Sequence, residues 1–183
     1  VATSKKDDDK NATSIVVQYA FKILDDNNNE VIKSRLLIAG DAEHEIWQHI
    51  IDNNKDDDKL KWNIFLAPHH CSWHAISTED KSTGSIDATI EEYLERSKEK
   101  AYIVASSKKI KRDTDNPPSY RAMNAYKKHV KYDSRFISTA DELYNDEPIP
   151  VKLKITVQGV SKESVKTDVK RHSIYTPKSY GEY

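Results

Sequence analysis

Apolar and polar residues alternate along the first part of the chain as they do in strands. Within SIVVQYAFKI the apolar side chains fall on every second position, at Ile15, Val17, Tyr19, Phe21 and Ile23. A period of two is typical of a strand with one buried face. The turn-forming segment LDDNNNE follows, and the apolar segment VIKSRLLIA comes after it. Residues 14–39 are therefore predicted to form a β-hairpin.

Further along, short apolar runs alternate with segments in which apolar residues recur every three or four positions. The second pattern predicts amphipathic helices at 41–54, 85–100 and 119–130. The apolar runs predict strands at 60–67, 101–106, 135–139 and 151–157. The polar segments at 54–59 and 107–118 are predicted loops, and residues 1–13 are a predicted disordered lead-in. This alternation favours an α/β fold with strands and helices in separate layers.

Length and composition limit the kinds of protein that the chain can be. Its 183 residues suffice for one domain, or part of one, with a sizeable core. With 29 basic and 30 acidic residues, the net charge of −1 neither favours nor excludes a polyanionic partner. One cysteine, Cys71, excludes an internal disulfide framework and fits a reducing, cytoplasmic environment. No apolar stretch approaches the roughly 20 residues that span a bilayer, so no membrane segment is expected in this chain.

Two predicted strands end in side chains of the types that bind metals. LLIAGD ends in Gly40 and Asp41 just before a helix, and IFLAPHH ends in His69 and His70. Because strand ends gather the ligands and chemistry of α/β folds, these side chains are candidates for one shared site. A carboxylate can bridge two cations, and neutral imidazole is a common ligand of zinc, manganese and iron. The pattern therefore predicts half of a metal site.

Each of these features also has a purely structural interpretation. Asp41 could cap the helix that follows it, and a histidine pair in a polar loop is most often exposed surface. Cys71 could supply a thiolate ligand or nucleophile, although a lone cysteine is more commonly buried. The basic segment SSKKIKR could be a solvated loop. No single feature decides between the structural and the functional interpretation. The order and spacing of the features along the chain are more informative.

Five segments follow one another in an order that a known family shares. They read KNATSIVVQYAF, LLIAGDAEHEIW, FLAPHHCSWHAIS, AYIVASSKK and DNPPSYRAMNAYKKHV. This order resembles the second half of the metallo-β-lactamase superfamily, in particular the hydrolase domain of competence DNA-uptake channel proteins and their soluble relatives. The resemblance covers residues 11–158 and is carried mainly by the Gly-Asp and Pro-His-His motifs. It implies the C-terminal half of an αββα sandwich over 14–158, a mixed sheet flanked by helices, with a C-terminal tail over 159–183.

The resemblance also implies a dinuclear zinc or manganese site and hydrolysis, often of phosphodiesters such as nucleic acid. The two cations would stabilise the charge that develops on the phosphoryl oxygens. Asp41 would be the bridging carboxylate and His70, favoured over His69, a terminal ligand. His69 would then support the metal site or face the substrate as a catalytic residue. The other expected site residues are Asn116 as a catalytic residue, and Ser72, His74, Ser106, Ser107 and Lys108 as substrate-binding residues.

The chain departs from the family at three places. The family's first metal motif, a His-x-His-x-Asp-His or His-x-Asp-x-Asp-His cluster, is absent from the 183 residues. Cys71 stands in place of the usual glycine, and Pro117-Pro118 stands where a His-Pro pair is common. One aspartate and one histidine cannot complete a dinuclear centre. The chain is therefore expected to hold half of a site.

Three explanations fit a half site. The chain could be the C-terminal portion of a cleaved or truncated hydrolase, which its start at Val1 favours. It could be a subunit that pairs with the missing half, or a degenerate fold member that serves as a binding or regulatory module. The first two predict an exposed apolar sheet face, because half a sandwich leaves its partner layer uncovered. A non-catalytic nucleotide- or protein-binding α/β domain is a further alternative, although the chain lacks a Gly-rich phosphate loop.

Overall fold

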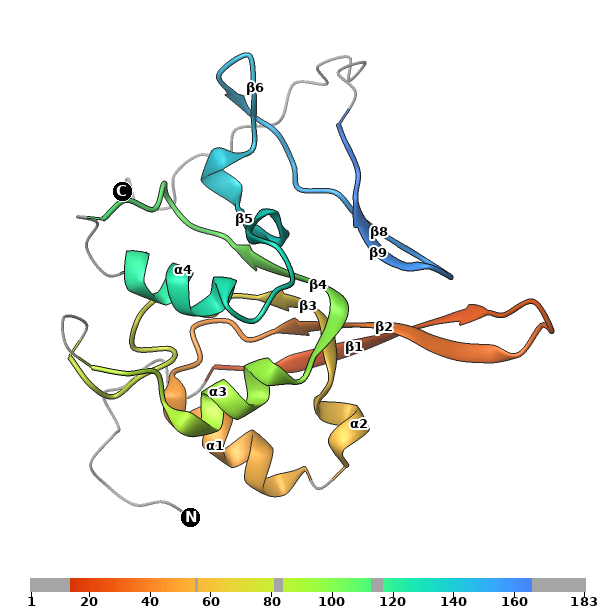
Figure 1. The fold of residues 1–183 in the computed structure, drawn as a ribbon, viewed down its shortest axis with the longest axis horizontal. Helices are drawn as coiled ribbons and strands as arrows, with labels where there is room; N and C mark the ends of the chain where they lie inside the picture. The colour runs from red at the N-terminus through yellow and green to blue at the C-terminus, as the bar shows by residue number, and fades with distance from the viewer. Residues whose placement is uncertain (1–13, 55, 81–83, 113–116, 166–183) are drawn as a thin grey trace, which may run out of the picture.

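Five strands form one mixed sheet in the computed structural model, which describes residues 14–54, 56–80, 84–112 and 117–165. In order across the sheet they are β1 (Val17–Leu24), β2 (Glu30–Ile38), β3 (Trp62–Leu66), β4 (Ser97–Ala105) and β5 (Phe136–Ser138) (Figure 1). β1 and β2 pair antiparallel as the predicted hairpin, and β2 to β5 run parallel. The prediction of an α/β chain is confirmed.

Three helices pack against one face of this sheet (Figure 1). They are α1 (His44–Asn53), α3 (Ala88–Glu95) and α4 (Tyr120–Lys127). The ring of Phe65 on β3 lies 5.8 Å from Trp47 on α1 and 5.9 Å from Tyr126 on α4, so one aromatic side chain joins the sheet to two helices. Burial of such large rings supplies much of the stabilisation of the layer. None of the helices in the described ranges is long and apolar enough to cross a membrane.

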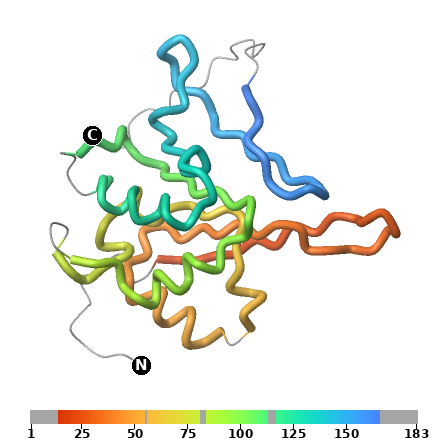
Figure 2. The backbone as a smooth tube through the Cα atoms, viewed as in Figure 1, coloured from red at the N-terminus to blue at the C-terminus, as the bar shows by residue number. Residues whose placement is uncertain are grey.

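The opposite face of the sheet is only partly covered. β8 (Leu153–Thr156) and β9 (Gly159–Lys162) form a hairpin over part of this face. Val160 of the hairpin forms a second core with four side chains of the sheet, Ile64, Tyr102, Val104 and Ile137. On β1, which extends with β2 beyond the other elements (Figure 2), Val17, Tyr19 and Phe21 are 37%, 51% and 37% exposed. Tyr19 pairs with Leu36, which packs against the second core, so these β1 side chains point to the same face. In the described part of the chain, β1 therefore has an exposed apolar strip of the kind that an uncovered half sandwich predicts.

Two boundaries in the first half of the chain differ from the sequence-based predictions. The helix predicted over 85–100 ends at Glu95, and its charged end SKEK begins β4, where Ser97 pairs with Trp62 of β3. Pairing with the neighbouring strand thus overrides the local helical pattern. The predicted loop at 54–59 contains most of the single-turn helix α2 (Asp57–Leu60), in which the Asp58 amide donates to the Asp56 side chain.

The C-terminal part contains strands that were not predicted. β6 (Leu143–Tyr144) and β7 (Glu147–Pro148) form a short hairpin, and single-turn 3-10 helices at Asp133–Arg135 and Thr139–Asp141 flank β5. β9 begins at Gly159, so the predicted boundary between domain and tail falls inside the β8–β9 hairpin. The predicted lead-in over 1–13 and residues 166–183 of the predicted tail lie outside the described residues.

Candidate functional site

The carboxyl ends of four strands meet at one edge of the sheet. Ile38 on β2 pairs with Leu66 on β3, and Leu66 pairs with Val104 on β4. Ala105 on β4 pairs with Ser138 on β5. The loops after these strands therefore begin side by side, in the place where parallel α/β sheets bind their ligands. The expectation that the Gly-Asp and Pro-His-His segments follow neighbouring strand ends is confirmed.

The loop after β3 is a left-handed turn. His69, His70 and Cys71 have φ angles of 47°, 54° and 67°. This conformation costs about 1–2 kcal/mol per L-residue, so three in succession store roughly 3–6 kcal/mol of strain. Two backbone hydrogen bonds hold the turn, from the Cys71 amide to the Pro68 carbonyl at 3.0 Å and from the Ser72 amide to the His69 carbonyl at 3.0 Å. Strain of this kind clusters at functional sites.

Contacts on two sides fix this turn against its neighbours. The His69 amide donates to the Gly40 carbonyl at 2.9 Å, which joins the turn to the loop after β2. The Ser119 amide, at the N-cap of α4, donates to the Cys71 carbonyl at 2.9 Å. The Ser119 hydroxyl in turn accepts from the Ala122 amide and caps the helix. The Gly-Asp loop, the histidine turn and the start of α4 are thus one connected unit.

The imidazole of His70 is held in one tautomer. Its Nδ1 lies 2.7 Å from the carbonyl oxygen of Ser106, just beyond the end of β4. A carbonyl oxygen only accepts hydrogen bonds, so Nδ1 carries the hydrogen and the lone pair of the neutral ring is on Nε2. Metal-binding histidines commonly donate their other N–H to a carbonyl, which orients the ring and raises its basicity. The exposed ring of His70 therefore shares this one feature with metal-binding histidines.

Asp41 does not cap the helix that follows it, so the capping interpretation is wrong. The N-cap of α1 is Glu43, and no side chain makes a cap hydrogen bond there. Within the described part of the chain, the Asp41 carboxylate makes no hydrogen bond or ion pair. Nδ1 of His69 lies 3.6 Å from Oε1 of Glu43, which is beyond the usual hydrogen-bond range. No described residue therefore occupies the Asp41 carboxylate, which makes it a candidate to bind a ligand.

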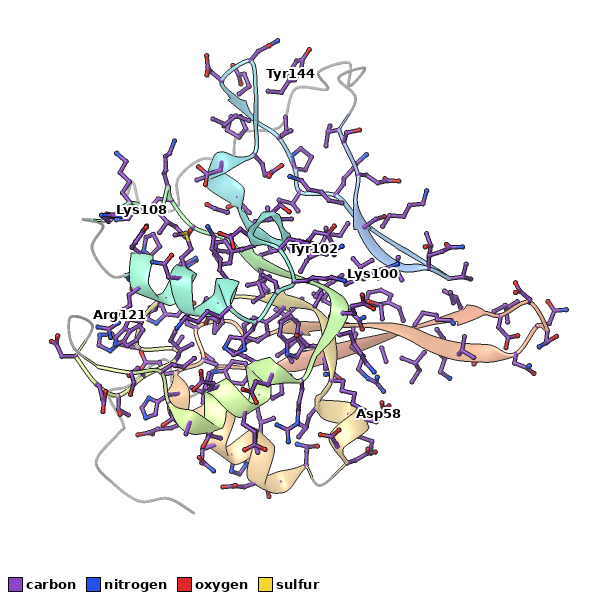
Figure 3. All side chains as sticks on the ribbon, in the orientation of Figure 1. Asp58, Lys100, Tyr102, Lys108, Arg121 and Tyr144 are labelled. Carbon is purple, nitrogen blue, oxygen red and sulfur yellow. The ribbon has the colours of Figure 1, made fainter. Side chains whose placement is uncertain are left out.

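A pocket of about 450 Å³ opens at the same edge of the sheet. It is lined by His70, Ser106, Ser107, Lys108, Pro117, Pro118 and Thr139, which include four of the predicted site residues. Lys108 lies beyond the end of β4 (Figure 3), and its ammonium group forms no ion pair with the described residues. No acidic side chain is among the described lining residues. The pocket therefore favours an anionic ligand.

Ser72 and His74 are not among the described residues that line this pocket. Ser72 is fully buried, and its hydroxyl accepts from the His74 amide at 3.2 Å, so it stabilises the loop. The side chain of His74 is exposed and does not line the pocket. Asn116 lies outside the described residues. Burial raises the pKa of the Cys71 thiol to about 12, so this cysteine is a protonated core residue and the thiolate interpretation is wrong.

Sequence reasoning missed Thr139 as a pocket residue. This threonine directly follows β5 and lines the pocket together with residues that follow β3 and β4. The rule that selected His70 and Ser106, namely that functional groups gather at strand ends, applies equally to Thr139. The signal was therefore present in the sequence, in the polar residues that end RFIST.

The donor types at this edge fit zinc or manganese, but their number is too small. Imidazole nitrogen and carboxylate oxygen are ligands of both metals. In the described ranges, no group of three or more His, Cys, Asp or Glu side chains is arranged to hold a metal ion. Asp41 and His70 would therefore need further ligands from beyond the described residues.

Comparisons of this chain with models of protein families, with curated proteins and with solved structures give no match. The resemblance to the metallo-β-lactamase superfamily therefore stays a prediction from the motifs. The function has to be inferred from the pocket and from the two strand-end loops that carry Asp41 and His70.

Proposed function

We propose that this chain is the C-terminal half of a metal-dependent hydrolase of the metallo-β-lactamase fold, acting on a phosphodiester. The first metal-ligand motif would come from an N-terminal portion of the same protein or from a partner chain. The observation that carries the proposal is the His70 ring beside the pocket, whose Nδ1 donates to the Ser106 carbonyl at 2.7 Å and whose Nε2 makes no hydrogen bond to the described residues.

Asp41 and His70 would hold one zinc or manganese ion and share it with ligands from the missing half. When bound, the metal would activate water and stabilise charge on the phosphoryl oxygens. The protein's own contribution is orientation. The Ser106 carbonyl fixes the ring of His70, and the left-handed turn fixes the position of that residue against the loop after β2.

The pocket supports a phosphate ester as the substrate. The ammonium group of Lys108, which forms no ion pair with the described residues, and the hydroxyl groups of Ser106 and Thr139 are of the kinds that proteins use to bind phosphate oxygens. A carboxylate would repel such a ligand, and the described lining has none. Nucleic acid is the phosphodiester that the family resemblance favours.

The uncovered face of β1 supports a missing layer. Val17, Tyr19 and Phe21 form an apolar strip on the same face as the second core, and no other described element covers it. An apolar layer from an N-terminal portion or a partner chain would bury this strip. The alternative function, a degenerate fold member that acts as a binding or regulatory module, predicts a self-sufficient sheet.

Metal binding to variants of the chain tests the proposal. His70→Asn is the most informative change, because the asparagine amide can still donate to the Ser106 carbonyl and tolerates a positive φ, yet offers no nitrogen in place of Nε2. We expect the wild-type chain to bind zinc or manganese weakly in equilibrium dialysis, because Asp41 and His70 supply only part of a ligand set. His70→Asn and Asp41→Asn should each lower the affinity about tenfold or more.

The matched control is His74→Asn, which removes an exposed histidine of the same loop that does not line the pocket. This variant should bind metal as the wild-type chain does. Equal metal affinity in the wild type and His70→Asn would contradict the metal site. It would favour the alternative function as a binding or regulatory module.

A further inference from the structure

Some hydrogen-bond donors around the pocket already have an acceptor within the protein, and others do not. The Ser107 amide donates to Oγ1 of Thr139 at 3.3 Å, and the Ser107 hydroxyl donates to the Lys108 carbonyl at 3.0 Å. Ser107 therefore has no donor left for a ligand. Oγ1 of Thr139 uses one lone pair to accept the Ser107 amide, and within the described residues the hydroxyl hydrogen of Thr139 has no acceptor.

We propose that Thr139 contacts the substrate, and that its hydroxyl donates to a phosphoryl oxygen held beside Lys108. The inference rests on the proposed function for the identity of the ligand, a phosphate ester. The Ser107 amide fixes the position of Oγ1 at the pocket lining before a ligand arrives, and the hydroxyl hydrogen can rotate toward the ligand. A phosphoryl oxygen there would accept one hydrogen bond from Thr139 and a charge-assisted one from Lys108.

The size and walls of the pocket favour an ester over a free phosphate ion. Its volume of about 450 Å³ falls within the range of small-molecule sites, roughly 300–1,000 Å³, and exceeds the needs of a single phosphate group. Pro117, which is partly exposed, adds an apolar wall that favours contact with an organic substituent over contact with a phosphate ion. A phosphodiester with organic groups on both sides should therefore bind more tightly than inorganic phosphate.

Binding to the metal-free chain tests this role separately from metal chemistry. In EDTA, NMR titrations would use inorganic phosphate and the dinucleotide thymidylyl-thymidine as two separate probes. We expect both to bind, the dinucleotide more tightly. Thr139→Val should weaken binding of each probe about tenfold, and Thr139→Ser, which keeps the hydroxyl, should restore most of the affinity. Thr89→Val removes a hydroxyl on α3 outside the pocket lining and should bind as the wild type does.

A double-mutant cycle with Lys108→Met distinguishes substrate contact from a merely structural role. If both side chains bind one phosphoryl group, the losses in Thr139→Val and Lys108→Met should be less than additive when the variants are combined. Additive losses, wild-type affinity in Thr139→Val, or no binding of either probe would overturn the proposal. Weaker probe binding in Thr139→Val, together with no metal binding by the chain, would contradict the proposed function. It would still support the phosphate-ester subsite.

Discussion

Replacing Cys71 with glycine should leave the protein more stable than replacing it with alanine. Both variants remove the buried thiol, so the difference between them isolates the Cβ atom at a φ angle of 67°. A Cβ in the left-handed conformation costs about 1–2 kcal/mol. Removing this Cβ therefore stabilises the folded state of the glycine variant. The greater conformational freedom of glycine in the unfolded chain offsets about 0.4–1 kcal/mol of this stabilisation. Cys71→Gly should therefore exceed Cys71→Ala in the free energy of unfolding by about 1 kcal/mol.

Urea denaturation of the two variants measures this difference, and thermal unfolding should show it as a shift of about 2–4 °C in Tm. The matched control is Ala75→Gly, in the same loop. Ala75 is also fully buried but does not have a positive φ angle, so glycine should destabilise the protein there. If Cys71→Ala equals or exceeds Cys71→Gly in stability, the left-handed turn that positions His70 is not formed in solution.

Three further predictions concern the scaffold of the site. Ser119→Ala removes the cap of α4 that accepts the Ala122 amide, and should lower the free energy of unfolding by about 1 kcal/mol; an unchanged urea midpoint would contradict the cap. The hydrogen bond from Arg35 lowers the pKa of Asp58, so the stability that this pair contributes is present above the ordinary value of 3.8 and is lost as the pH falls below it. Wild type and Asp58→Asn should therefore differ in stability at pH 7 and converge in acid, and a difference independent of pH would refute this. Tyr126→Phe removes a buried hydroxyl that has no partner among the described residues, and should be neutral or stabilising by about 1 kcal/mol in thermal unfolding; a clear loss of stability would reveal a partner.

The parts of the fold that sequence predicted well are those in which local pattern and tertiary structure agree. The period of two in β1, with the turn-forming segment and the apolar run of β2 after it, matches a hairpin. The apolar stripe of α1 matches the face that packs on the sheet. The segment SKEK of residues 97–100 shows the limit of this reasoning. Its charged residues continue a helical pattern, yet they form the start of β4 because Ser97 pairs with Trp62, a contact between residues far apart in the sequence.

In the candidate site, too, local pattern located the motifs, whereas contacts between residues far apart in the sequence could not be predicted. The Gly-Asp and Pro-His-His motifs could be located from the sequence because each ends an apolar run that becomes a parallel strand. The contacts that define the chemistry span long separations. Ser106, whose carbonyl accepts from the His70 ring, is 36 residues from His70 in the sequence. Thr139, whose Oγ1 accepts from the Ser107 amide, is 32 residues from Ser107. Local pattern carries no information on such pairs. Neither the tautomer of His70 nor the Thr139 hydroxyl without an acceptor among the described residues could therefore be predicted.

The most direct measurement of the central claim is the ¹⁵N NMR spectrum of the His70 ring during a zinc titration. We expect the free ring to have its hydrogen on Nδ1, where the Ser106 carbonyl accepts it, and zinc to shift the Nε2 resonance while Nδ1 stays protonated. In Asp41→Asn the same shift should require a higher zinc concentration. A ring with its hydrogen on Nε2, or an Nε2 resonance that does not respond to zinc, would contradict the assignment of His70 as a metal ligand.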